Sequence, residues 1–295
     1  MLEPSSIVEI HQVSRQFGEK MALKEVSLSV PRGGVFGLIG GNGAGKTTLI
    51  KHVLGMLKAQ QGSVRVFGLD PVQDPVGTLG RIGYLSEERE LPDWMRVGEL
   101  MRYTQAFFRN WDEAYAEELR TSFDLDKKAR IKTLSRGQRA RAGLLVALAH
   151  RPELLVLDEP SSGLDPVVRR DILGAIIRTI ADDGRTVLFS SHLLDEVERV
   201  ADRVAIIHQG QIMLTAAMDE IKQQHRRMTL RFDQSLDRPP VVQGALSTTG
   251  KGNEWSYICF GDREQLTRAA MTTGATILSD EALSLDEIFV SRILK

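Results

Sequence analysis

The chain has 295 residues, of which 42% are hydrophobic and 26% charged, with a formal net charge of -1. This is the composition of a globular protein, and the length suffices for one large or two ordinary domains. The net charge argues against a strongly basic nucleic-acid surface but leaves a local basic patch open. One cysteine, Cys259, excludes an internal disulfide and suits a reducing cytosol. No apolar run approaches the ~20 residues that cross a bilayer, and the opening M-L-E-P-S-S lacks a basic stretch followed by an apolar one, so we expect any membrane role to depend on a partner chain.

Two strands are expected near the start of the chain, because apolar and polar residues alternate over residues 7–13 and again over residues 26–30. Between them, Phe17 stands just before Gly18. A lone aromatic residue in such a place usually packs against its own domain. Because a glycine-rich stretch follows at residues 40–48, Phe17 is also placed to stack on an adenine ring.

Residues 40–48 read G-G-N-G-A-G-K-T-T and match the phosphate-binding pattern G-x-x-x-x-G-K-[ST]. An apolar run at residues 35–39 precedes them and a helical pattern begins at Thr47, which is the strand, loop and helix context that the pattern requires. A glycine-rich turn without a ligand is the alternative, and the flanking strand and helix disfavour it. The candidate nucleotide-binding residues are Gly40, Gly41, Asn42, Gly43, Ala44, Gly45, Lys46, Thr47 and Thr48.

The chemistry of this loop follows from its residue types. Gly40, Gly43 and Gly45 lack a Cβ, so the loop is free to turn sharply and to direct its amide N–H groups at a polyphosphate. The helix that follows adds the positive end of its dipole. Lys46 is expected to reach the β- and γ-phosphates of ATP, and the Thr47 hydroxyl is expected to bind Mg²⁺.

After the loop, an apolar stripe predicts a helix that ends near residues 61–62, and a short strand follows at residues 63–67. The stripe consists of Leu49, Ile50, Val53, Leu54 and Leu57. Residues 91–149 have a mostly helical pattern, and Pro152 ends that block.

Two continuous apolar runs, at residues 154–157 and 186–190, predict buried strands, and their alternation with helices indicates a parallel sheet. The helix between them begins at Asp165 and Pro166, a capping residue followed by proline at the first helical position. Residues 204–207 and 212–214 flank a turn and predict a hairpin. The residues of the helix that are expected to face inward are Ile172, Leu173, Ile176, Ile177 and Ile180.

The pattern changes after about residue 222. Residues 228–232 and 255–260 alternate like half-exposed strands, and two further helices begin at capping residues, Asp262 and Ser284. We therefore expect two domains: a larger domain at residues 1–222, with a helical subdomain at about 88–150, and a small α+β accessory domain at residues 223–295. Docking is the default role for the accessory domain, with regulation and dimerisation as alternatives.

Two adjacent carboxylates, Asp158 and Glu159, follow the apolar run at residues 154–157. Asp158 is placed to hold Mg²⁺, as a strand-end aspartate does in ATPases with a phosphate-binding loop. Glu159 is placed to orient, or to accept a proton from, the water that attacks the γ-phosphate. Two acids that merely end a strand are the alternative, and the glycine-rich loop makes it the weaker one.

A second stretch, L-S-R-G-Q at residues 134–138, has two compatible interpretations. Ser135 and Gln138 have the spacing of a capping box at the start of a helix. A capped helix start that contains glycine is also an anion site. Ser135, Gly137 and Gln138 are therefore candidates to close on a γ-phosphate bound by another subunit.

In the order of these motifs, the chain resembles the ATP-binding subunit of ABC transporters over about residues 7–214. Two of the matching residues also have an explanation within one chain. Asp165 fits a helix cap, and this explanation is as good as a contact of Asp165 across a dimer. His192 also fits the start of a helix. The matching motifs are the A-loop aromatic Phe17, the Walker A loop at residues 40–48, the LSGGQ signature at 134–138, the Walker B strand at 154–158, the catalytic carboxylate Glu159, the D-loop at 162–165 and the switch histidine His192.

This resemblance implies an α/β fold: a P-loop NTPase core with a parallel sheet, antiparallel edge strands and a helical subdomain, followed by the small C-terminal α+β domain. It implies hydrolysis of ATP with Mg²⁺, with Lys46, Glu159 and His192 as catalytic residues. Two such subunits pair head to tail in this family, so that each ATP lies between the Walker motifs of one subunit and the signature of the other.

The same resemblance implies partners and a location. We expect a second, identical ATP-binding subunit and separate transmembrane permease subunits, and no nucleic acid. The protein is then cytoplasmic, peripheral on the cytoplasmic face of the membrane, and its hydrolysis of ATP powers transport.

Two residues depart from the family pattern. Glu87 stands where the family usually has the Q-loop glutamine; a glutamate there still offers a contact to Mg²⁺ but changes the local charge, so it is expected to retune hydrolysis. Arg136 replaces the first glycine of the signature and leaves Ser135, Gly137 and Gln138 intact. Together with the helical segment from Asp112 to Asp126 and the small C-terminal domain, these features most resemble the ABC-2 export type.

Trp94 and Met95 follow the Q-loop, in the region that receives a coupling helix of the membrane subunit in this family. Both are candidates for that groove. Apolar residues there are at least as often part of the subdomain core, which is the alternative.

Two other classes of function are open. One is a soluble ABC-type ATPase that does mechanical work on nucleic acid or ribosomes; such chains commonly carry two nucleotide domains or long coiled coils, whereas this chain has one phosphate loop and no heptad run. The other is a P-loop kinase or GTPase, which has no use for a serine loop from a second subunit.

Overall fold

The computed structural model describes residues 6–293, and the side chains of residues 6–178 and 184–292. The chain divides into two compact units, Met1–Thr215 (unit 1) and Ala216–Lys295 (unit 2). The division falls slightly before residue 222, where the sequence pattern changes. In the described part of the chain, no helix has both the length and the apolar composition needed to cross a membrane.

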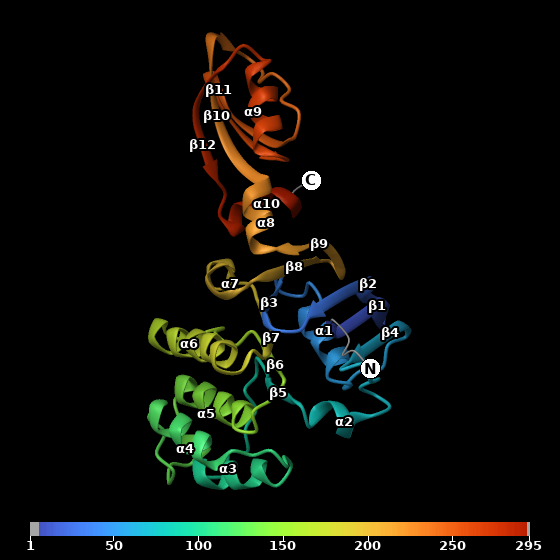
Figure 1. The fold of residues 1–295 in the computed structure, drawn as a ribbon, viewed down its shortest axis with the longest axis vertical. Coiled ribbons are helices and arrows are strands. Elements are labelled where there is room, and N and C mark those ends of the chain that lie inside the picture. The colour runs from blue at the N-terminus through green and yellow to red at the C-terminus, as the bar shows by residue number, and fades with distance from the viewer. Residues whose placement is uncertain (1–5, 294–295) are drawn as a thin grey trace. The chain divides into compact units, whose positions relative to one another are not determined.

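Unit 1 is built on a six-stranded sheet with the strand order β5-β6-β7-β3-β8-β9 (Figure 1). The pairs within β5-β6-β7-β3-β8 are parallel, and β6 and β7 are buried along their whole length, which explains their apolar runs. The strands are β3 (Gly34–Ile39), β5 (Ile82–Leu85), β6 (Leu154–Asp158), β7 (Thr186–Ser191), β8 (Arg203–His208) and β9 (Gln211–Ala217).

The neighbouring positions of β6, β7 and β3 in the sheet bring the candidate site residues together. Parallel strands end at the same edge of a sheet, and ligands of open α/β sheets bind outside those carboxyl ends. The glycine-rich loop follows β3, Asp158 and Glu159 end β6, and His192 follows β7. Three segments that are far apart in the sequence therefore meet at one edge.

A second, antiparallel sheet of three strands has the order β2-β1-β4, with β1 (Ser6–Phe17), β2 (Lys20–Pro31) and β4 (Gln61–Val66). Helix α1 (Lys46–Val53) shares one core cluster with both sheets: Leu49 and Ile50 lie in it with Val8 of β1 and with Leu38 and Val156 of the larger sheet. Burial of these side chains fixes the helix that follows the loop.

The remaining helices of unit 1 lie mostly on the side away from the antiparallel sheet; in Figure 1 the green and yellow helices α3 to α6 form this group. Several of them lie within residues 88–150, where the sequence predicts a helical subdomain. The helices are α2 (Pro75–Leu79), α3 (Val97–Gln105), α4 (Glu113–Ser122), the 3₁₀ helix η1 (Ile131–Thr133), α5 (Arg136–Leu148), α6 (Pro166–Asp183) and α7 (Leu194–Val200).

Two expectations, the end of α1 and the inward side of Ile177, are wrong, and the alternative left open for Met95 is decided. Helix α1 ends at Val53 rather than near residue 61, because Gly55 adopts the left-handed backbone (φ +69°) that terminates a helix. Ile177 does not face inward and is 52% exposed, while Ile180 lies outside the described side chains. Met95 is 3% exposed and belongs to the core, so it is no candidate for a docking groove.

Unit 2 contains α8 (Met218–Gln224), β10 (His225–Leu236), β11 (Ala245–Phe260), α9 (Arg263–Met271), β12 (Thr276–Ala282) and α10 (Leu285–Ile293). Its strands form an antiparallel sheet of order β11-β10-β12. Met228, Leu230 and Tyr257 of the sheet pack with Leu266 and Ala270 of α9 in a separate core. The predicted fold class, an α/β core with a small α+β unit, is confirmed.

Candidate functional site

The loop after β3 has the backbone that its glycines predict. Gly43 and Gly45 have positive φ, +76° and +114°. A Cβ on Gly45 would lie 2.7 Å from the carbonyl oxygen of Ala22, and one on Gly40 would lie 2.5 Å from that of Ile207. No larger residue fits either place without moving backbone, so the loop is held close to β2 and β8 at the start of α1.

A cavity of about 310 Å³ lies against this loop. The structure brings Phe17, the loop and the two distant carboxylates Glu87 and Glu159 together around it. The candidate residues that do not line it are Gly40, Gly41, Ser135, Gly137, Gln138, Asp158, Asp165 and His192. The lining residues are Phe17, Lys20, Ala22, Asn42, Gly43, Ala44, Gly45, Lys46, Thr47, Thr48, Glu87 and Glu159.

Lys20 and Ala22 are cavity residues that the sequence did not single out. Lys20 is paired with Phe17 across the turn between β1 and β2, and its Nζ is 3.8 Å from the position of a Cβ on Gly43. The sequence feature that indicates Lys20 and Ala22 is the short turn after Phe17. Such a turn places the first residues of β2 beside the aromatic residue at the end of β1.

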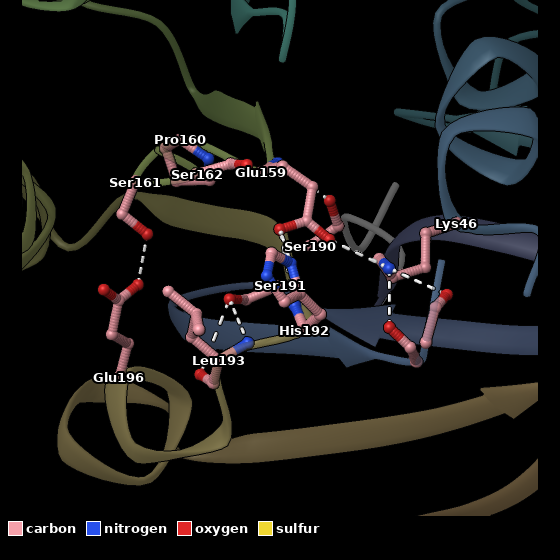
Figure 2. A network of polar contacts seen from close by, with 12 residues as sticks. Lys46, Glu159, Pro160, Ser161, Ser162, Ser190, Ser191, His192, Leu193 and Glu196 are labelled. Carbon is pink, nitrogen blue, oxygen red and sulfur yellow. Dashed lines mark hydrogen bonds and ion pairs between the residues drawn. The ribbon is translucent and has the colours of Figure 1, made fainter. Parts of the chain in front are cut away.

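Lys46 and Glu159 form a buried ion pair beside the loop, shown in Figure 2. Lys46 Nζ is 2.9 Å from Glu159 Oε1, and their side chains are 6% and 5% exposed. Nζ also donates hydrogen bonds to the carbonyl oxygens of Gly40 (2.6 Å) and Gly41 (3.2 Å). In this arrangement Lys46 points at the carboxylate and at its own loop, where a bound phosphate would compete for it.

His192 completes the network. Its Nδ1 is 2.7 Å from Glu159 Oε2, and its backbone N–H lies 3.4 Å from the same oxygen. Glu159 has a left-handed backbone (φ +48°), and its own N–H donates to the Ser190 hydroxyl at 3.0 Å. The carboxylate therefore lies between Lys46 and His192, fixed from the ends of two neighbouring strands.

Asp158 has a different environment. It is 1% exposed, and Ser190 Oγ donates a hydrogen bond of 2.6 Å to its Oδ1. Burial raises the pKa of the Asp158 carboxyl, while hydrogen bonds from Ser190 and Thr47 act in the opposite direction. The contact with Thr47 joins two of the three side chains that the sequence assigned to a metal.

These residues suit Mg²⁺ by the chemistry of their donor set. A hydroxyl (Thr47) and carboxylates (Asp158, Glu87) are the hard oxygen ligands that this ion prefers. Among the described residues, no three His, Cys, Asp or Glu side chains gather as a metal site. An ion here would therefore need Thr47 and oxygens of the nucleotide as well.

The signature stretch lies at the start of α5 and forms the predicted capping box. Ser135 Oγ accepts a hydrogen bond from the Gln138 N–H (3.2 Å), and Gln138 Oε1 accepts one from the Ser135 N–H (3.0 Å). Ser135 and Arg136 are exposed and Gly137 is buried. The guanidinium of Arg136 lies against Gly163, whose Cβ would be 2.5 Å from Nη1.

Asp165 caps α6, as the sequence predicted. Its Oδ1 accepts hydrogen bonds from the N–H groups of Val167 (3.0 Å) and Val168 (3.1 Å). Asp165 therefore has a structural role within its own chain, as the cap of α6.

A phosphate-binding loop that opens a helix, with strand-end carboxylates beside it, defines a P-loop nucleoside triphosphatase. Comparisons of the chain with known proteins identify the family within this class. Residues 23–162 match the family described as ABC transporter. The chain is 33% identical to the uncharacterized ABC transporter ATP-binding protein YhaQ of Bacillus subtilis (strain 168), over 97% of this chain and 98% of that protein.

Two further similarities agree. The chain is 30% identical to the bacitracin transport ATP-binding protein BcrA of Enterococcus faecalis, over 78% of this chain and 75% of that protein. A solved ATP-binding subunit of an ABC transporter is 27% identical, with a TM-score of 0.68, over 74% of this chain and 92% of that one. The chain belongs to the family of ABC transporter ATP-binding proteins, and it is a nucleotide-binding ATP hydrolase.

Proposed function

We propose that Phe17 and residues 40–48 hold ATP in the cavity and that Lys46, Glu159 and His192 carry out its hydrolysis. Phe17 stacks on the adenine, and Lys46 leaves Glu159 to bind the β- and γ-phosphates. The observation that carries the proposal is a network beside the phosphate loop, in which the buried Glu159 carboxylate lies between the buried Lys46 and the exposed His192.

In the reaction, the water oxygen forms a bond to the γ-phosphorus while the bond from this phosphorus to the bridging oxygen breaks, giving ADP and phosphate. Glu159 orients the water and accepts its proton, and His192 holds Glu159 and the water in place. Thr47, Asp158 and Glu87 would hold Mg²⁺, which neutralises charge on the phosphates. Since Lys46 is withdrawn from Glu159 by ATP, the carboxylate becomes available as a base only when nucleotide is bound.

We further propose that each ATP site is completed by a second copy of the chain. Ser135, Gly137, Gln138 and Asp165 lie outside the cavity of their own chain, yet Ser135 is exposed at a helix start, where backbone N–H groups attract an anion. In a head-to-tail pair these residues face the γ-phosphate bound by the partner. The family resemblance supports the same arrangement.

The work done by this pair is transport through separate membrane chains. The chain is peripheral on the cytoplasmic face in this proposal, and export is the direction that its resemblance to the ABC-2 export type implies. Trp94, 71% exposed, is the proposed contact for a coupling helix of the membrane subunit. Unit 2 is an accessory domain that docks in the assembly. Mechanical work on nucleic acid or ribosomes is set aside, because the relatives are transport proteins.

A mixing experiment tests the composite site. Lys46→Ala disables the Walker side of a chain, and Ser135→Arg fills its signature side; each variant alone is expected to be inactive. When they are mixed, a mixed dimer has one intact site, so an equal mixture recovers about a quarter of the wild-type rate.

The matched control is a mixture of Lys46→Ala with Glu159→Gln. Both changes lie on the Walker side, so no intact site forms and no activity returns. If the first mixture is as inactive as its two parents, or the control mixture recovers equally, the composite site is wrong.

A further inference from the structure

Arg89 is a buried arginine that connects two loops of the site without lining the cavity. It is 3% exposed and lies two residues after Glu87. Its Nη2 donates hydrogen bonds to the carbonyl oxygens of Pro160 (3.0 Å) and Ser162 (2.9 Å), directly after Glu159. Its own backbone is fixed, because the Arg89 N–H donates to both the carbonyl and the hydroxyl oxygen of Ser86 at 3.2 Å.

The turn that Arg89 holds begins with the strained backbone of Glu159 (φ +48°). Figure 2 shows this turn, from Glu159 to Ser162, with Ser161 directed at Glu196 of α7. The Ser161 hydroxyl donates a hydrogen bond to Glu196 Oε2, and both residues are buried. The turn is therefore held from two sides, by Arg89 through its backbone and by Glu196 through Ser161.

We propose that Arg89 is a positioning residue for hydrolysis, which keeps the Glu159 carboxylate in register with the loop that carries Glu87. This inference rests on the proposed role of Glu159. Movement of the Glu87 loop is transmitted through the guanidinium to the turn after Glu159, so the two sides of the cavity move together. The link is made within one chain.

An arginine suits this link. Its planar guanidinium presents several N–H donors in fixed directions, and a charged donor makes stronger hydrogen bonds to carbonyl oxygens than a neutral one. Burial lowers the pKa of the Arg89 guanidinium; nearby Arg136 lowers it further, whereas Glu87 raises it. The two residues that depart from the family pattern are thus the charges that act on Arg89.

The test compares three variants of the full chain, with kcat, KM and equilibrium affinity for ATP measured for each. Arg89→Met removes the donors and keeps much of the volume, and Arg89→Lys keeps a charged donor. Arg120→Met is the matched control, because Arg120 also donates to a backbone carbonyl, that of Leu125 at 2.7 Å, in the helical subdomain. Glu159→Gln is measured in parallel.

We expect Arg89→Met to lower kcat about 10- to 100-fold, since small displacements of catalytic groups have effects of this size. Its KM and ATP affinity stay within about twofold of wild type, because the phosphate loop is untouched. Arg89→Lys recovers part of kcat, and Arg120→Met leaves kcat unchanged. If Arg89→Met fails to bind ATP at all, the kcat of Arg89→Lys decides, and a value below wild type with unchanged affinity supports the proposal.

Three results would overturn the inference, and they are distinguishable. If both Arg89 variants keep the wild-type kcat while Glu159→Gln is inactive, Arg89 does not position Glu159 and the proposed function stands. If Glu159→Gln hydrolyses ATP normally, the proposed function fails, and the role of Arg89 fails with it. A loss of ATP affinity with unchanged kcat in both Arg89 variants would also reject the positioning role.

Discussion

Replacing Glu159 by glutamine separates the two roles of this carboxylate. In the structure, Glu159 is the buried counter-ion of Lys46 at 2.9 Å. Glutamine keeps the shape and one acceptor oxygen but removes the charge. A hydrogen bond to a charged group contributes about 1.5–3 kcal/mol, so we expect the free energy of unfolding without nucleotide to fall by about 2 kcal/mol.

The expected effect of Glu159→Gln on catalysis is larger than its effect on stability, and the substitution does not weaken ATP binding. Loss of a general base lowers kcat by about 10²–10⁴. ATP affinity is retained or increased, because Lys46 no longer has to leave a carboxylate to reach the phosphates. Bound ATP should therefore restore the stability of the variant to that of wild type.

The assays are chemical denaturation with and without nucleotide, and phosphate release at saturating ATP and Mg²⁺. Glu153→Gln is the control, because Glu153 forms a half-exposed pair with Arg81, for which less than about 1 kcal/mol is expected. A Glu159→Gln protein that turns over like wild type, or that matches its stability without nucleotide, refutes the reasoning.

Three further predictions concern other sites. Lys46→Ala should abolish ATP binding, measured by equilibrium titration; binding within about threefold of wild type would mean that Lys46 does not contact the phosphates. Trp94→Ala should leave the basal ATPase rate of the isolated chain unchanged and reduce its stimulation by the membrane partner, whereas equal loss of both rates would indicate damage to the subdomain. Burial lowers the pKa of His150 from 6.5 to about 4. As the pH falls below 6.5, the unfolded chain therefore binds a proton at His150 that the folded chain does not bind. The stability that His150 contributes above pH 6.5 is lost as the pH falls towards 4. Between pH 7 and pH 5 this loss is about 2 kcal/mol, and denaturation curves of His150→Gln should lack it; an unchanged slope would contradict the burial argument.

The local chemistry of the site was predictable because it is encoded by neighbours in the sequence. The glycines of residues 40–48 require their own backbone, the capping box of Ser135 and Gln138 spans four residues, and Asp165 caps the helix that it precedes. The parallel sheet then joins the strand ends, so Glu159 was expected beside the loop.

The early end of α1 is a local miss, set by the backbone of Gly55, whereas the other misses depend on contacts between distant segments. Met95 is buried and Ile177 exposed although both are apolar, because burial is decided by the elements that pack nearby. The two hydrogen bonds of Arg89 reach across more than 70 residues of sequence, and no spacing announces them. The pairing of Lys46 with Glu159 also escaped prediction, since the loop motif describes only what lysine does with a phosphate present.

The most direct test of the account is the mass of Glu159→Gln in solution with ATP and Mg²⁺, measured by analytical ultracentrifugation. The account predicts a single chain without nucleotide and a dimer with ATP, and it predicts that adding Ser135→Arg to the same chain abolishes the dimer while ATP still binds. A Glu159→Gln protein that binds ATP and stays monomeric at every concentration, alone and with its membrane partner, would contradict the central claim that two chains share each ATP.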